Sequence, residues 1–142
     1  MRESLPSIQR SFRLSSRTVE LLDEAAAAGG ESRNALADRL LGEAVRLERH
    51  PLIRFHHGPA GRRQPLVVSS RLYVHQVMST LRASDGNVEE TADYLGIAAR
   101  LVRAAVEYYA EFADDVDQDA AVAERVAADE RARWERQQRA LA

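Results

Sequence analysis

Hydrophobic and polar residues alternate over residues 8–14, the first patterned segment of the chain. Two sets of side chains fall on opposite sides of an extended backbone: Ile8, Phe12 and Leu14 on one side, and Gln9, Ser11 and Arg13 on the other. A period of two over seven residues predicts a β-strand with one buried face. Arg10 lies on the apolar side, where its aliphatic stem can follow the rim of that face.

Two helices are expected after this strand. Ser15 and Ser16 offer hydroxyl caps for the first helix, and Gly29-Gly30 is typical of its end. Ser32 is expected to cap the second helix. The apolar positions of both helices follow a helical period: Val19, Leu22, Ala25 and Ala26, then Leu36, Leu40, Leu41, Ala44 and Val45.

The predicted strand at residues 8–14 has no partner strand nearby in the sequence. The next strand-like residues begin at Leu52, after both helices. An unpaired strand would expose its backbone N–H and C=O groups. We therefore expect it to pair with the same strand of a second copy, which gives an antiparallel two-stranded ribbon on four helices and makes dimerisation part of folding.

The middle of the chain predicts a short hairpin followed by three helices. The hairpin spans residues 52–68 around a Gly/Pro turn at residues 58–61. We expect Ser70 and Asn87 to cap the next two helices, and Gly96 to mark the turn into a longer one. A short helix, a glycine turn and a longer helix are typical of a helix-turn-helix. Residues 114–142, rich in charge and thinly apolar, predict a separate last helix that begins among acidic residues.

The sequence thus predicts a mainly α-helical protein in three parts. Residues 1–49 form a dimeric strand-helix-helix domain, residues 50–113 a small helix-turn-helix-like domain with a short hairpin, and residues 114–142 a charged amphipathic tail helix. The net charge of −2 conceals a basic front and an acidic rear, because residues 1–63 hold 11 Arg against 8 acidic residues and residues 64–142 hold 9 against 14.

Composition narrows the function classes. The chain has no cysteine, which excludes a disulfide scaffold and a thiol enzyme and fits a reducing cytoplasm. No run of about 18 apolar residues predicts a membrane span. The histidines and serines lack the spacing of metal ligands or of a nucleophile elbow, and no phosphate-binding glycine loop occurs. We expect neither catalysis nor a cofactor.

Residues 8–48 resemble the ribbon-helix-helix fold of the Arc/MetJ/CopG repressors. The resemblance is carried by Gln9-Arg-Ser-Phe-Arg-Leu14, by Ser15-Ser16 ahead of Val19-Glu-Leu-Leu22, and by Gly30-Glu-Ser32-Arg-Asn34. It implies that the alternating polar residues of the strand, Gln9, Ser11 and Arg13, contact bases in the major groove. It also implies that Ser32, Arg33 and Asn34, at the start of the second helix, contact a phosphate.

The downstream part is similar to a small helix-turn-helix domain of VapB-type antitoxins, whose partners are PIN-like ribonucleases. The similar text runs from His50-Pro51-Leu-Ile-Arg-Phe55 through Gly58-Pro-Ala-Gly-Arg62-Arg63 to Leu101-Val-Arg-Ala-Ala-Val-Glu-Tyr-Tyr109. This resemblance implies a cognate ribonuclease toxin as partner. The candidate partner-binding residues lie on the charged tail: Val122, Val126, Arg131, Arg133, Trp134 and Arg136.

These observations predict a cytoplasmic repressor that dimerises, or forms a higher even oligomer, on operator DNA and serves as the antitoxin of a toxin–antitoxin pair. Two alternatives stay open, namely a plain repressor without a toxin and a dimeric protein–protein adaptor. Arg100 and Arg103 allow the helix-turn-helix to be a second DNA reader, but the nearby Glu107 and Glu111 fit a structural role equally well. Arg62-Arg63 allow an anion site at the hairpin turn, which a tight turn explains as well.

Overall fold

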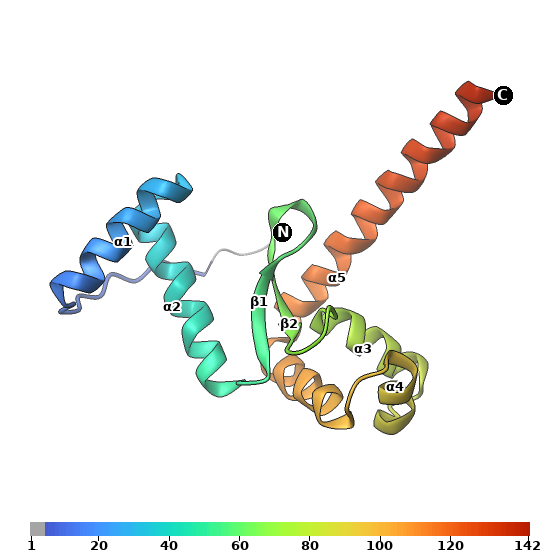
Figure 1. Cartoon of the computed structure of the whole chain (residues 1–142), viewed down its shortest axis with the longest axis horizontal. Helices are drawn as coiled ribbons and strands as arrows, with labels where there is room; N and C mark the ends of the chain where they lie inside the picture. Colours follow the sequence, from blue (N-terminus) through green and yellow to red (C-terminus); the bar gives the residue numbers. More distant parts are fainter. Residues whose placement is uncertain (1–4) are drawn as a thin grey trace. The chain divides into compact units, whose positions relative to one another are not determined.

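A computed structural model of the chain describes residues 5–142, apart from the side chain of Ala60 (Figure 1). It divides into two compact units, Met1–Gly42 (unit 1) and Glu43–Ala142 (unit 2). The elements are α1 Ser16–Gly29, α2 Arg33–Arg49, β1 Ile53–His57, the short 3-10 helix η1 Pro59–Gly61, β2 Arg63–Val67, α3 Val74–Ala83, α4 Val88–Leu95 and α5 Ala99–Leu141. Helix α2 begins in unit 1 and ends in unit 2. The described chain is therefore mainly helical, with one small antiparallel sheet, as expected.

Unit 1 contains α1 and the first part of α2, with the caps that the sequence predicts. The Ser15 hydroxyl accepts a hydrogen bond from the backbone N–H of Thr18, and Gly30 ends α1 in the left-handed conformation with φ of 67°. The Ser32 hydroxyl accepts from the N–H of Ala35 at 3.1 Å. Local hydrogen bonding thus confirms the start of both helices and the end of α1.

The expected strand at residues 8–14 is not formed within the single chain. Residues 5–14 are neither helical nor paired as a strand, and both strands of the described residues follow α1 and α2. The physical reason is that a strand exists only through its hydrogen-bonded neighbour, and the described residues of this chain supply none. A strand at this position therefore requires a second molecule.

Unit 2 is built on the hairpin of β1 and β2, whose antiparallel register runs from Ile53↔Val67 to His57↔Arg63. Side chains alternate between the two faces of the hairpin. One face carries Ile53 and Val67, which are buried with α3, α4 and α5 in a shared hydrophobic core. Tyr108 of α5 is fully buried in that core and packs edge-on against Phe55.

Helices α3 and α4 largely follow the sequence prediction. The apolar stripe of α3 is buried, Asn87 caps α4 by accepting from the N–H of Glu90 at 3.0 Å, and Gly96 has φ of 68°. The expected cap at Ser70 is wrong, because α3 begins later, after Tyr73. The Ser70 hydroxyl instead donates to the carbonyl of Val67 and accepts from the N–H of Leu72, so it closes the turn after β2.

Helix α5 extends through the expected boundary at residues 113/114. The acidic residues that follow are therefore not the start of a separate helix, although helical geometry is interrupted at Phe112, with φ −125° and ψ 39°. Asp119 is the last buried residue of α5, and the helix continues to Leu141 without burying another residue. Within residues 5–142, no helix has both the length and the apolar content needed to cross a membrane.

Candidate nucleic-acid and partner interfaces

The predicted base-contacting residues lie on an exposed segment of unit 1. Gln9, Ser11 and Arg13 are exposed, but so are the apolar residues that alternate with them. Ile8 is 77% exposed, Phe12 68% and Leu14 55%. Large apolar side chains in an alternating row are not normally left in water, so this segment lacks the surface that would cover it.

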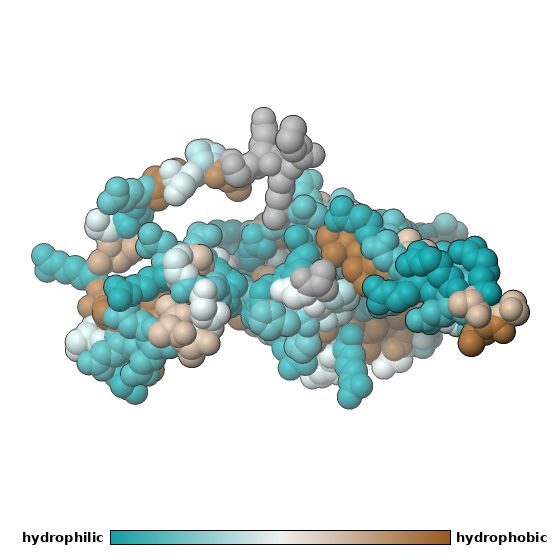
Figure 2. All heavy atoms as spheres, turned by 90° about the horizontal axis from the view of Figure 1, so that it is seen from above, coloured by the Kyte–Doolittle hydropathy of each residue, from teal (hydrophilic) through white to brown (hydrophobic). Residues whose placement is uncertain are grey.

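The helices of unit 1 share this shortage of packing. Among the described residues of the unit, Ala26 and Leu36 are the buried hydrophobic ones. Four larger apolar side chains of unit 1, on α1 and the first part of α2, remain substantially exposed: Val19, Leu21, Leu40 and Leu41. Figure 2 shows hydrophobic atoms at the surface of this part of the chain, on the left of the view. Helices α1 and α2 are therefore amphipathic, but few of the apolar side chains of unit 1 are buried in a hydrophobic core.

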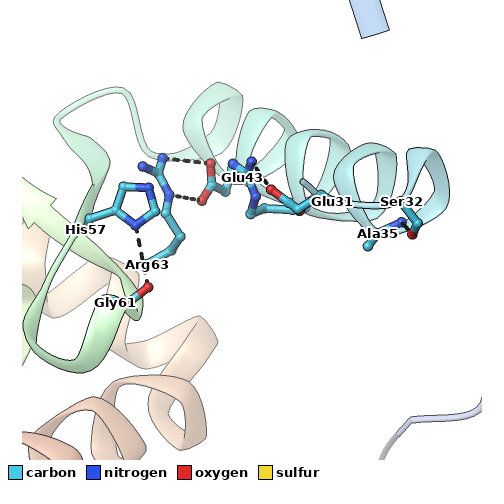
Figure 3. Close-up of polar contacts among 8 residues, drawn as sticks. Glu31, Ser32, Ala35, Glu43, His57, Gly61 and Arg63 are labelled. Carbon is cyan, nitrogen blue, oxygen red and sulfur yellow. Dashed lines mark hydrogen bonds and ion pairs between the residues drawn. The ribbon is translucent and has the colours of Figure 1, made fainter. Parts of the chain in front are cut away.

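The predicted phosphate-contacting residues stand at the start of α2. Ser32 caps the helix by accepting from the N–H of Ala35 (Figure 3). Asn34 is exposed in the first turn. The Arg33 guanidinium forms an ion pair with Asp23 of α1 at 2.9 Å, on an exposed surface. Because such a surface pair contributes little free energy, Arg33 can exchange this carboxylate for a phosphate at small cost.

The two arginines of the hairpin turn are occupied by carboxylates of unit 2. Arg63 donates two hydrogen bonds to Glu43, at 2.8 and 3.0 Å (Figure 3). Arg62 donates to Asp119 at 2.5 Å, and the side chain of Asp119 is 3% exposed. These bonds use the guanidinium groups to fasten the turn to α2 and α5, so we do not retain a free anion site at Arg62-Arg63.

A second set of polar contacts joins the end of α2 to α5. Arg46 donates to the hydroxyl of Tyr108 at 3.2 Å, pairs with Asp115 at 3.0 Å, and lies 4.3 Å from the centre of the Phe112 ring. Burial raises the pKa of the Tyr108 hydroxyl, although the Arg46 hydrogen bond acts in the opposite direction. This network fixes the end of α2 to α5 within unit 2. No local sequence pattern indicates it, because the partners are more than 60 residues apart.

The outer face of the hairpin carries polar residues that sequence reasoning did not combine. On the face opposite the core, Arg54 pairs with Leu66 and His56 with Gln64, and Leu66 in turn forms a bridge with Tyr73. Arg54 and His56 are exposed, whereas Gln64 is fully buried. No hydrogen-bond partner for either amide atom of Gln64 is present among the described residues.

Aromatic rings continue this face toward the start of α3. Nδ1 of His56 lies 3.4 Å from the Tyr73 hydroxyl, and the rings of Tyr73 and His75 stack nearly parallel with centroids 5.8 Å apart. Burial lowers the pKa of His75, and the nearby charge of Asp119 acts in the opposite direction. Burial therefore favours the neutral form of the His75 ring.

The predicted partner-binding residues lie on the part of α5 that follows Asp119. Trp134 is 59% exposed; Val122 and Val126 are half-buried. Trp134 follows buried Val116 by 18 residues, which is five turns and about 27 Å, so both lie on one side of the helix. The predicted arginines, Arg131, Arg133 and Arg136, point in different directions around the helix axis. The six predicted partner-binding residues therefore do not share one face of α5, because the three arginines are spread around the helix.

The helix-turn-helix offers a less basic surface than its sequence suggests. Arg103 pairs with Glu89 of α4 at 2.6 Å, while Arg100 is exposed. Glu107 is exposed one turn further on.

Within the described residues, no group of three or more His, Cys, Asp or Glu side chains is arranged to hold a metal ion. No family model, curated protein or solved structure matches this chain.

Proposed function

We propose that the protein is a dimeric transcriptional repressor of the ribbon-helix-helix type. The observation that carries this proposal is the exposed, alternating segment at residues 8–14 beside two helices that also expose apolar side chains. Pairing of this segment with the same segment of a second copy satisfies its backbone and covers its apolar face. The same pairing presents Gln9, Ser11 and Arg13 on the outer face of a ribbon that fits the major groove.

The start of α2 supports the same proposal. The N-terminus of a helix presents free backbone N–H groups and the positive end of its dipole. In the proposed complex, the backbone and side chains of Ser32, Arg33 and Asn34 bind a phosphate beside the groove, which positions the ribbon but reads no sequence.

We further propose that the exposed end of α5 binds a protein partner, and that this partner is a ribonuclease toxin of the PIN-like class. The support is the length of helix beyond Asp119 that buries no residue of its own unit and carries Trp134 as an exposed aromatic anchor. In this reading the protein is an antitoxin that represses its own operon. A plain repressor and a dimeric adaptor are the alternatives that the experiments separate.

Light scattering and DNA binding together test the repressor proposal. The full chain should be a dimer at micromolar concentration, and it should bind the DNA immediately upstream of its own reading frame. Arg13→Ala should weaken specific binding by about 1–3 kcal/mol, because one guanidinium–guanine contact is lost. Fluorescence anisotropy with the upstream fragment and with a scrambled duplex measures specific and non-specific affinity.

Arg10→Ala is the matched control, because it removes the same charge from the apolar side of the same segment. It should lower both affinities equally and leave their ratio unchanged. A monomeric mass, or an Arg13 variant with the wild-type ratio of specific to non-specific affinity, would contradict direct readout by this segment. A dimer that prefers no DNA sequence would favour the adaptor.

A further inference from the structure

The outer face of the hairpin presents an arrangement that the proposed repressor does not use. We define the hairpin face by the residues Arg54, His56, Arg71, Tyr73 and His75. Arg54, His56 and Arg71 are exposed, and no carboxylate partner for Arg54 or Arg71 is found among the described residues. Beneath this face lies Gln64, fully buried and without a hydrogen-bond partner for its amide.

Burying an amide without hydrogen bonds is costly, so Gln64 calls for an explanation. Transfer of such a group out of water is unfavourable, and most buried polar side chains are paired. Gly58 allows this burial: a Cβ atom at Gly58 would lie 3.0 Å from Cδ and Nε2 of Gln64 and 3.3 Å from the hydroxyl of Tyr73. The turn, the amide and the Tyr73 hydroxyl therefore converge on one point.

The side chain of Tyr73 is held in place weakly. Its hydroxyl makes a single long contact of 3.4 Å with exposed His56, and its ring stacks on His75. Gln64 and Tyr73 are diagonal neighbours on the same face of the sheet, because Leu66, two residues from Gln64, pairs with Tyr73. A ligand reaches the amide only if the Tyr73 hydroxyl moves away from His56 while the ring keeps its stack on His75.

The start of α3 adds a site for negative charge. Helix α3 begins at Val74, directly after Tyr73. The N–H groups of Gln76 and Val77 donate to the Tyr73 carbonyl, and those of Val74 and His75 have no acceptor among the described residues. Arg71 precedes the helix by three residues, and no acidic residue occurs in its first turn. A phosphate at this helix start is favoured by the dipole and by Arg71 and Arg54.

We propose that the hairpin face binds an unstacked nucleotide, as found in single-stranded nucleic acid. The base stacks on the Tyr73–His75 pair, the amide of Gln64 bonds to the edge of the base, and the phosphate lies at the start of α3 near Arg54 and Arg71. A glutamine amide matches the paired donor and acceptor of adenine. Stacking on aromatic rings in a basic groove is the general mode of single-strand binding. Base-paired duplex should bind this site more weakly, because Gln64 is buried and a base would have to leave the stack to reach it.

The test uses the full chain and a short fluorescein-labelled oligoadenylate, as RNA and as DNA, in anisotropy titrations. The same strand annealed to its complement is the duplex arm, and adenosine monophosphate is the competitor. Wild-type protein should bind either single strand more tightly than the duplex. Competition by adenosine monophosphate that also depends on Gln64 would show that the same site takes a free nucleotide.

Three variants separate the contributions of the hairpin face. Gln64→Met keeps the volume and removes the amide, and should weaken binding about tenfold while its thermal unfolding midpoint is unchanged or higher. Tyr73→Leu keeps an apolar cover and should weaken binding at least fivefold, because stacking is lost. The double variant Arg54→Ala/Arg71→Ala should reduce the slope of log affinity against log salt by about 1.4.

Arg100→Ala is the matched control, because Arg100 is an exposed arginine on another element of unit 2. It should leave the affinity within twofold of wild type. Equal binding of single strand and duplex, a folded Gln64→Met protein with wild-type affinity, or an equal loss in Arg100→Ala would overturn the proposal.

Discussion

The Arg62–Asp119 ion pair provides the sharpest test of how unit 2 is held together. The two side chains are 26% and 3% exposed, and Nε of Arg62 lies 2.5 Å from Oδ1 of Asp119. Arg62→Met keeps most of the side-chain volume but leaves a buried carboxylate without its cation. Removing one partner of a buried pair costs about 3–5 kcal/mol, and we expect that loss of unfolding free energy at pH 7.

The loss should depend on pH in a defined direction. Burial raises the pKa of Asp119, while the Arg62 hydrogen bond opposes that shift, so the pKa of Asp119 should rise further in Arg62→Met. A carboxyl whose pKa is higher in the folded state stabilises the fold below its unfolded value of about 4, and that stability is lost as the pH rises through the folded pKa. The deficit of the variant should therefore shrink near pH 4.

Urea unfolding followed by circular dichroism at pH 7 and pH 4 measures both effects. Arg100→Met is the matched control and should change the unfolding free energy by less than about 0.5 kcal/mol. In the double variant Arg62→Met/Asp119→Leu no buried charge remains unpaired, so most of the stability should return. An Arg62→Met protein within about 1 kcal/mol of wild type at pH 7, or an equal deficit at both pH values, would refute this account.

Two further predictions concern the hairpin and the end of α5. Gly58→Ala places a Cβ atom 3.0 Å from the Gln64 side chain and should destabilise the protein by about 1–3 kcal/mol, measured by thermal unfolding. Gly86→Ala is the control, because no atom lies near its Cβ position. It should show only the cost of the positive φ at Gly86. A chain that ends at Ala121 keeps Val116 and Asp119 and should retain its unfolding midpoint and upstream-DNA affinity. If the proposed ribonuclease toxin is co-expressed, the shortened chain should fail to restore growth. Restored growth would show that the end of α5 is not needed for partner binding.

One feature of the candidate site follows from local sequence. The cap at Ser32 depends on neighbouring residues, so the capping preferences were enough to locate it. The alternation at residues 8–14 does not separate a buried from an exposed row in the single chain, where all of these residues are exposed. Whether the row becomes a strand depends on a second molecule, which no local pattern contains. The hairpin face was not predicted, since it combines β1, β2 and the start of α3 through pairings such as Leu66↔Tyr73.

The sequence by itself determined the elements whose ends are set by nearby hydrogen bonds and by backbone freedom: the caps at Ser15 and Asn87, the left-handed turns at Gly30 and Gly96, and the hairpin. Only the tertiary structure decided the rest. Arg62 and Asp119 are 57 residues apart, and Arg63 and Glu43 are 20 apart, so their pairing depends on how helices and hairpin pack. The burial of Gln64 was equally unpredictable, because glutamine is ordinarily exposed and its exclusion from water results from packing by residues distant in the sequence.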